Sequence, residues 1–221
     1  MQFIFNRIFT ETSAQQIIFE EIYPSLESAL DCEKESIFAF GQTGSGKTYT
    51  MLGANGYPIS INDSLSDSCG ILPKAAEFFK AKEARKKNGY KITIKFSAIE
   101  IYNETIRDLF TSAINLDVIG TSEVSIKGLC IRTINTQSEL PGIVKCVLKI
   151  CQQGKQTKTI NPSSRSHCIM QFIIESTFQG KSKLGLLNIV DLAGPERANK
   201  VTMANKSKEE RADEESTNRS K

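Results

Sequence analysis

One short segment of the chain carries glycines, hydroxyl groups and a lysine at a spacing that suits phosphate chemistry. It reads GQTGSGKT and satisfies the pattern G-x-x-x-x-G-K-S/T. Glycines let the backbone turn so that several N–H groups point at one anion, Lys47 can reach the terminal phosphates, and the Thr48 hydroxyl can bind Mg²⁺. An apolar run precedes the segment, so we expect a nucleotide site rather than a plain glycine-rich turn. The predicted phosphate-binding residues are Gly41, Gln42, Thr43, Gly44, Ser45, Gly46, Lys47 and Thr48.

A second candidate segment follows the apolar run LGLLNIV and reads Asp191-Leu-Ala-Gly194. An acidic residue at the end of a strand can hold the coordination shell of Mg²⁺, and the N–H of a glycine three residues later can donate to a γ-phosphate. Aspartate in this position is also a common turn former. Because residues 41–48 occur in the same chain, we favour the functional interpretation.

The third candidate segment, residues 161–167, reads NPSSRSH. Its hydroxyls can complete a Mg²⁺ shell or orient a water molecule, and Arg165 can pair with a carboxylate. By composition alone, an ordinary polar loop explains it equally well. Its interpretation therefore depends on the other two segments.

The composition bounds the remaining possibilities. The 221 residues are 39% hydrophobic and 24% charged, which is typical of a globular chain with one large domain. A net charge of +3 is too small to predict nucleic acid or a membrane surface as partner. Six scattered cysteines and one histidine predict reduced thiols and no zinc site, and no apolar run reaches membrane-spanning length.

Each candidate segment adjoins an expected strand. Residues 36–40 (SIFAF) read as a buried strand that ends at the first segment, and residues 184–190 as a strand covered on both faces that ends at Asp191. Residues 167–178 form a strand that starts at the end of NPSSRSH. Helical spacing predicts a helix over 13–30, although Pro24 argues against one unbroken helix. The other expected elements are a short strand or apolar anchor at 3–9, a loop at 53–70, helices at 71–87 and 139–153, a strand at 90–98, and short strands over 111–135.

The segments GQTGSGKTYTM, SSRSH and DLAGPE occur in this order, and together they resemble the motor domain of kinesins. EIYNETIRDLF and the opening FIFNRIF are similar to further kinesin segments, so the resemblance covers most of residues 3–197. GILPKAAEFF, followed by a strand and EIYNE, is most similar to the C-terminal-motor, minus-end-directed class.

The resemblance implies an α/β fold of the P-loop NTPase type, a kinesin-like motor core with a mixed central β-sheet flanked by helices and incomplete at the C-terminus. Residues 1–197 would form this partial core. Residues 198–221 would match the loop and the start of the helix after the second switch. From residue 197 onward the chain has no aromatic residue and 12 charges, so we expect this tail to be mobile.

The resemblance also implies a function: an ATPase that binds ATP and Mg²⁺ and couples hydrolysis to microtubule binding and movement, in the cytoplasm and cytoskeleton, with the spindle as one candidate place. Tyr49 would lie near adenine. Ser164 would join Thr48 and Asp191 around Mg²⁺ and stand near the attacking water. Arg165 would pair with Glu196 when the switches close, and Gly194 would donate to the γ-phosphate. The implied catalytic residues are Ser164, Arg165, Gly194 and Glu196.

Four departures from the family pattern leave an alternative open. Met1 begins after the family's adenine-packing strand, Asn161 lies one residue from SSRSH instead of two, and Pro195 stands where serine is usual. The family's main microtubule-binding elements would follow the last residue. The alternative is therefore a non-motile nucleotide-binding or assembly module with the same fold. A GTPase is disfavoured because the chain has no N-K-x-D-like base-reading motif. Direction, cargo and oligomeric state stay open.

Overall fold

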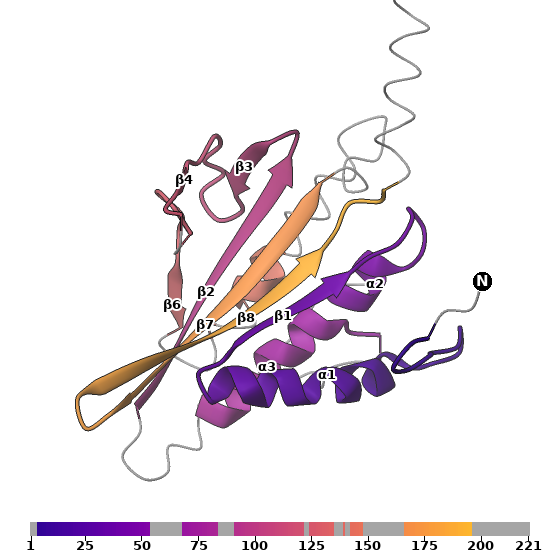
Figure 1. Ribbon diagram of the computed structural model, residues 1–221, viewed down its shortest axis with the longest axis horizontal. Coiled ribbons are helices and arrows are strands. Elements are labelled where there is room, and N and C mark those ends of the chain that lie inside the picture. Colours follow the sequence, from indigo (N-terminus) through magenta and orange to yellow (C-terminus); the bar gives the residue numbers. More distant parts are fainter. Residues whose placement is uncertain are drawn as a thin grey trace, which may run out of the picture.

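The computed structural model describes residues 4–53, 68–83, 91–121, 124–134, 139, 142–147 and 166–195. Its centre is a mixed sheet with the strand order β1-β8-β7-β2-β3, in which β6 also pairs with β2 (Figure 1). β1 runs parallel to β8, and the other pairs are antiparallel. The strands of this sheet are β1 (Lys34–Ala39), β2 (Lys91–Tyr102), β3 (Thr105–Asp108), β6 (Arg132–Ile134), β7 (His167–Phe178) and β8 (Lys181–Asp191). A separate pair consists of β4 (Val118–Ile119) and β5 (Ser125–Ile126).

Three of the described helices gather on one side of the sheet (Figure 1). They are α1 (Gln15–Leu30), α2 (Lys47–Leu52) and α3 (Ile71–Glu83). α1 packs on β1 and β8, α3 contacts β2, and α1 and α3 contact each other. Among the described helices, none has the length and apolarity needed to cross a membrane.

The core lies between these helices and the sheet. The ring of Phe172 is 5.0 Å from that of Phe79 and 4.7 Å from that of Phe96, measured between centroids, and all three side chains are fully buried. Burying one such side chain contributes about 1.5–3 kcal/mol to stability. The core therefore fixes the sheet against the helices that carry the functional segments.

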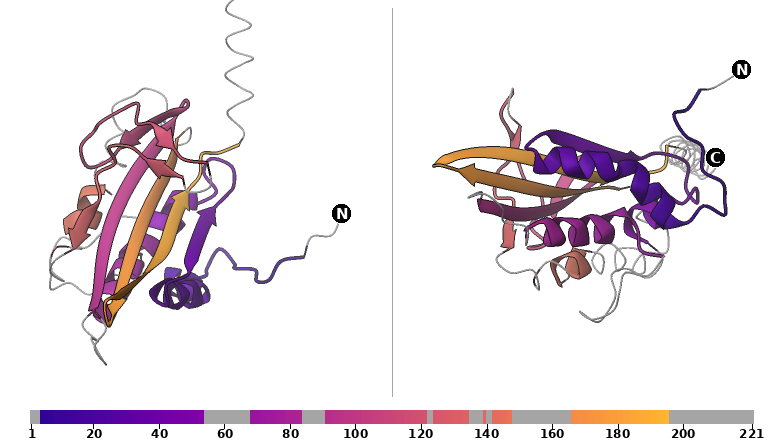
Figure 2. Two further views of the ribbon diagram at one scale, coloured as in Figure 1. Left: turned by 60° about the vertical axis from the view of Figure 1, so that its left-hand side comes forward. Right: turned by 90° about the horizontal axis from the view of Figure 1, so that it is seen from below.

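The hairpin of β7 and β8 determines which residues of the two strands lie opposite each other next to the candidate site. Its turn residues Gln179 and Gly180 have φ angles of 47° and 77°, which suit a tight two-residue turn. The pairing runs from Phe178 opposite Lys181 to Cys168 opposite Asp191. The turn projects beyond the helices (Figure 2), so the other end of the hairpin lies at the opposite end of the sheet, next to α2.

Most predicted elements are confirmed. The strand 167–178 has the predicted bounds, and the helices 13–30 and 71–87 correspond to α1 and α3. β2 is longer than predicted, short strands occupy part of 111–135, and residues 139 and 142–147 are helical. The loop expected at 53–70 and the charged tail lie almost wholly outside the described residues.

Pro24 does not interrupt α1, contrary to the sequence prediction. The helix continues through it because buried residues on both sides, Phe19 before it and Leu26 after it, pack into the same core. Proline removes the N–H that would bond to the carbonyl of Glu20, but Glu20 and Pro24 are both exposed, so water can satisfy that carbonyl.

Two expectations about apolar runs are wrong. β1 is not buried on both faces: Ile37 packs against the core, but Phe38 is 61% exposed. The helices α1 and α2 contact β1, and within the described part of the chain no element covers the face that carries Phe38. Residues 4–9 form no strand, and Ile4, Phe5 and Ile8 are exposed, because no described strand pairs with them.

Candidate nucleotide-binding site

Residues 41–46 form a loop between β1 and α2, and Lys47 and Thr48 begin the helix, as a phosphate-binding motif requires. Lys47 is the first residue of α2, and its ammonium group donates to the carbonyl oxygens of Gly41, at 2.7 Å, and Gln42, at 3.0 Å. The backbone N–H of Ser45 donates to Gln42 O at 3.2 Å and closes the turn. The positive charge of Lys47 is therefore held over its own loop.

The glycines of this loop fit a phosphate cradle. Gly44 and Gly46 have φ angles of 85° and 89°, which side-chain-bearing residues rarely adopt. A Cβ at either position would meet no atom within 4 Å, so the space beside the backbone is open. A Cβ at Gly41 would instead lie 2.6 Å from Ser45 Oγ. Gly44 and Gly46 thus leave room for a ligand to approach the backbone, and Gly41 allows the loop to close.

The second segment meets the first through side chains. Thr48 Oγ1 donates to Asp191 Oδ2 at 2.7 Å. Asp191 is the last residue of β8, and it lies opposite Ala39, the last residue of β1, in the parallel register. A hydroxyl and a carboxylate in contact form the oxygen-rich donor set that Mg²⁺ prefers, so these residues fit the cation.

The chain after β8 is anchored at three successive residues. Asp191 contacts Thr48, Leu192 N donates to Ala39 O at 3.3 Å, and Ala193 N donates to His167 Nδ1 at 3.2 Å. Gly194 follows and is buried. The candidate γ-phosphate donor is thus held in place by neighbours on β1, β7 and the phosphate-binding loop.

Two residues of this region were missed by the sequence analysis. Gln15, at the start of α1, is 3% exposed, and its Nε2 donates to the carbonyl oxygen of Tyr49 at 2.6 Å. This bond ties α1 to α2, while the ring of Tyr49 is 49% exposed and accessible to a base. His167 was considered only as part of a polar segment, and its bond to Ala193 has no signal in the sequence.

The remaining predicted site residues cannot be placed. Ser164, Arg165 and Glu196, together with Asn161, lie outside the described residues. Their roles stay predictions.

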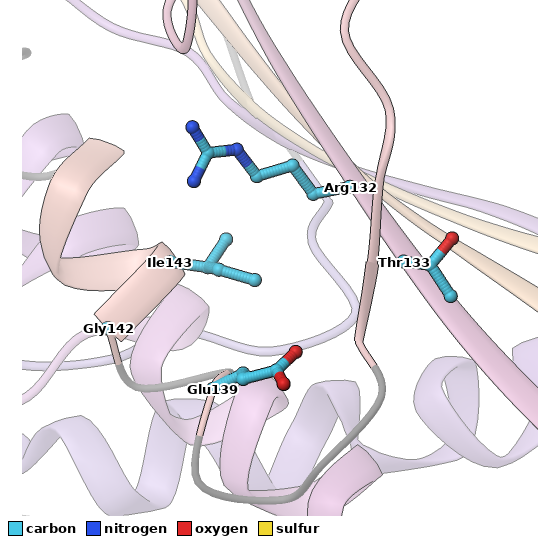
Figure 3. A pocket seen from close by; sticks show the side chains of 5 residues that line it. All are labelled: Arg132, Thr133, Glu139, Gly142 and Ile143. Carbon is cyan, nitrogen blue, oxygen red and sulfur yellow. The ribbon is translucent and has the colours of Figure 1, made fainter.

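A cavity of about 520 Å³ lies at the other edge of the sheet and contains none of the predicted residues. It is lined by Arg132, Thr133, Glu139, Gly142 and Ile143. Figure 3 shows Arg132 reaching toward the helical segment that carries Ile143, whereas Thr133 points to the other side of its strand. Arg132 also stacks on the ring of Phe110, 4.4 Å from its centroid. Because this cavity is separated by β2, β7 and β8 from β1 and its phosphate-binding loop, we do not assign the nucleotide to it.

Comparison with known proteins decides the family. A model described as the kinesin motor domain matches residues 1–220. The chain belongs to the kinesin motor domain family. It is 37% identical over 212 residues to kinesin-like protein KIN-14N of Oryza sativa subsp. japonica, a match that covers 90% of this chain and 27% of that protein. It is 34% identical over 212 residues to carboxy-terminal kinesin 2 of Xenopus laevis, covering 88% and 31%.

The fold agrees with this kinesin assignment. A solved structure of a fast kinesin superimposes with a TM-score of 0.77 at 32% identity, over 87% of this chain and 54% of that chain. The predicted resemblance is confirmed, and the similar proteins include carboxy-terminal kinesin 2. The chain spans less than a third of the length of these two curated relatives.

Proposed function

We propose that this chain is the ATP-binding part of a kinesin motor that couples ATP hydrolysis to microtubule binding and movement. The observation that carries the proposal is the 2.7 Å contact between Thr48 and Asp191. It joins the phosphate-binding loop to the segment proposed to recognise the γ-phosphate. The contact supports a shared metal and phosphate site, because the two motifs follow neighbouring parallel strands.

Thr48 and Asp191 would hold Mg²⁺, with Ser164 as a third oxygen donor. The cation supplies charge neutralisation at the phosphates. Lys47 would leave the carbonyls of Gly41 and Gln42 to contact the phosphates, because a charge-assisted contact with an anion is stronger than one with neutral carbonyls.

The other roles follow the chain order of the motifs. Gly194 would donate its N–H to the γ-phosphate, and the pairing of Arg165 with Glu196 would align the attacking water. Such contacts exist only while the γ-phosphate is present, so they can order the loops before hydrolysis and release them afterwards. Tyr49 would pack near adenine, since its ring is half exposed beside the loop.

The proposed partner is the microtubule, and the proposed location is the cytoskeleton. The support comes from similarity: the fast kinesin at 32% identity was solved for its implications for ATPase mechanism and interactions with microtubules. Similarity to carboxy-terminal kinesin 2 supports a carboxy-terminal type of motor.

The deciding experiment is ATP turnover by the purified chain with and without microtubules. Lys47→Ala is expected to abolish turnover, and Lys34→Ala, at an exposed lysine on β1, is the matched control. Turnover that rises with microtubules and is lost only in Lys47→Ala supports the proposal. Nucleotide binding without any microtubule response would support the non-motile alternative. A chain that neither binds nor hydrolyses ATP would refute the proposal and leave only the assembly module among the alternatives.

A further inference from the structure

We infer that His167 is a positioning residue, which orients the backbone of the segment 191–194 so that the Gly194 N–H can distinguish ATP from ADP. The inference rests on the proposed nucleotide function and adds a residue to it. Its basis is the 3.2 Å hydrogen bond in which the Ala193 N–H donates to His167 Nδ1.

The bond lies just beyond the end of regular pairing. The ladder of β7 and β8 ends with Cys168 opposite Asp191, so Ala193 is beyond the reach of backbone pairing with β7. His167, one residue before Cys168, accepts a hydrogen bond from the Ala193 N–H through its side chain, in place of a backbone carbonyl of β7. The ring belongs to a firmly held backbone, because His167 also pairs with Ile101 of β2.

Holding Ala193 restricts Gly194 directly. Peptide units are planar, so only the φ and ψ angles of Ala193 separate the anchored N–H from the N–H of Gly194. On the other side Pro195 has a fixed φ and restricts the residue before it. Gly194 would otherwise be the most mobile residue of the segment. The histidine on one side and the proline on the other preorganise its N–H for an anion.

The chemistry of the bond predicts which substitutions preserve it. The acceptor is Nδ1, which is separated from Cβ by one atom. Asparagine places its Oδ1 at the same separation, whereas glutamine places its oxygen one bond farther out. His167→Asn is therefore expected to keep the bond, and His167→Gln and His167→Ala are expected to lose it.

The test is the affinity of the full chain for ADP and for the slowly hydrolysed analogue ATPγS, with Mg²⁺ present. The bond acts on the nucleotide only through the orientation of Gly194, so the preference for ATPγS over ADP should fall in His167→Ala and His167→Gln by up to the worth of one neutral hydrogen bond, about three- to tenfold. His167→Asn should restore the preference. Thr177→Ala is the matched control, because it removes an exposed 2.9 Å side-chain contact to Ser182 at the far end of the same hairpin.

Thermal unfolding shows whether each variant is folded, and hydrogen exchange shows whether the bond at Ala193 is lost. All variants should remain folded, and the amide of Ala193 should exchange faster in the alanine and glutamine variants only. If every variant binds ADP and keeps the wild-type preference for ATPγS, the role of His167 is refuted and the nucleotide function stands. If the wild-type chain binds neither nucleotide, the inference falls together with the proposed function.

Discussion

Thr48 and Asp191 are 143 positions apart in the chain, yet their side chains are joined by a 2.7 Å hydrogen bond between Oγ1 and Oδ2. They meet because β1 and β8 are parallel neighbours. The loop after β1 and the segment after β8 therefore both begin where the carboxyl ends of these strands lie. In open α/β sheets, ligands bind beyond the carboxyl ends of the strands. The contact between Thr48 and Asp191 is thus a consequence of the sheet topology and also marks the candidate nucleotide site.

Replacing Thr48 should separate metal-dependent from metal-independent nucleotide binding. Thr48→Val removes the hydroxyl at similar volume, and we expect it to weaken ADP binding in Mg²⁺ by about 10- to 100-fold, the usual cost of losing a group that supports a metal site. Thr48→Ser keeps the hydroxyl and should bind like the wild type. Labelled ADP, titrated in Mg²⁺ and again in EDTA, measures the effect. Unchanged Mg²⁺ dependence in Thr48→Val would remove Thr48 from the proposed metal site.

Gly185 is required where the carboxyl end of α1 crosses β8. A Cβ at this position would overlap the carbonyl group of Ala29 and lie 3.0 Å from the Cα of Cys32. Gly185→Ala therefore forces α1 away from the sheet, and we expect a loss of about 1–3 kcal/mol in the free energy of unfolding. Urea unfolding measures it.

Gly142 provides the matched control for Gly185. It is exposed and helical, and a Cβ there would have no atom within 4 Å. Gly142→Ala should leave stability unchanged or raise it by about 0.4–1 kcal/mol. Similar destabilisation in both variants would mean that the crossing of α1 over β8 is not the cause.

Local patterns predicted much of this molecule. The strand 167–178 was predicted with its observed bounds, because the segment is rich in β-branched and aromatic residues. The loop 41–48 was predicted because its function requires particular residues at fixed spacing, and that spacing is visible in the sequence. Features that depend on neighbours in sequence were therefore recovered.

Several features that depend on distant partners were not recovered, in contrast to the meeting of Thr48 and Asp191. Phe38 is exposed because no described element covers its face of β1, and the composition of SIFAF does not encode that. The continuity of α1 through Pro24 follows from core contacts on both sides, which outweigh a local propensity. The bonds of Gln15 to Tyr49 and of His167 to Ala193 join residues that no periodic pattern relates.

Cys32 should react slowly with alkylating agents while the chain is folded. Burial raises the pKa of the Cys32 thiol, although nearby Lys183 partly opposes this shift. At a given pH less thiolate is present than in the unfolded chain, and thiolate is the reactive form. Mass spectrometry of the peptide containing Cys32, after iodoacetamide treatment in buffer and in urea, measures the difference. Equal rates at pH 8 would contradict it.

The same thiol predicts a loss of stability in alkali. The folded state holds the Cys32 proton more tightly than the unfolded state, where the ordinary pKa is 9.0. The thiol's contribution to stability is therefore fully present below that value and is lost as the pH rises through the raised pKa. Urea midpoints of the wild type and of Cys32→Ala should fall differently above about pH 9, with the steeper fall in the wild type.

Asp108 should be the side chain on which the region after β3 depends most. It is fully buried, and both carboxylate oxygens accept backbone N–H groups: Oδ1 from Phe110 at 2.6 Å and Thr111 at 3.1 Å, Oδ2 from Cys130 at 2.6 Å. Asp108→Asn turns one acceptor into a donor that faces another N–H. We expect it to lower the free energy of unfolding by about 1–3 kcal/mol, because a buried polar group loses its partner.

Asp117→Asn is the control for this prediction, since Asp117 is exposed and its backbone carbonyl, which accepts from Lys127 N at 2.9 Å, is unaffected by the substitution. Its effect should stay within about 0.5 kcal/mol, as for other surface changes. Urea unfolding of both variants gives the comparison. If Asp108→Asn is no less stable than Asp117→Asn, the carboxylate does not hold Cys130 to the turn after β3, and the order of that region must come from apolar packing, such as that of Leu109, instead.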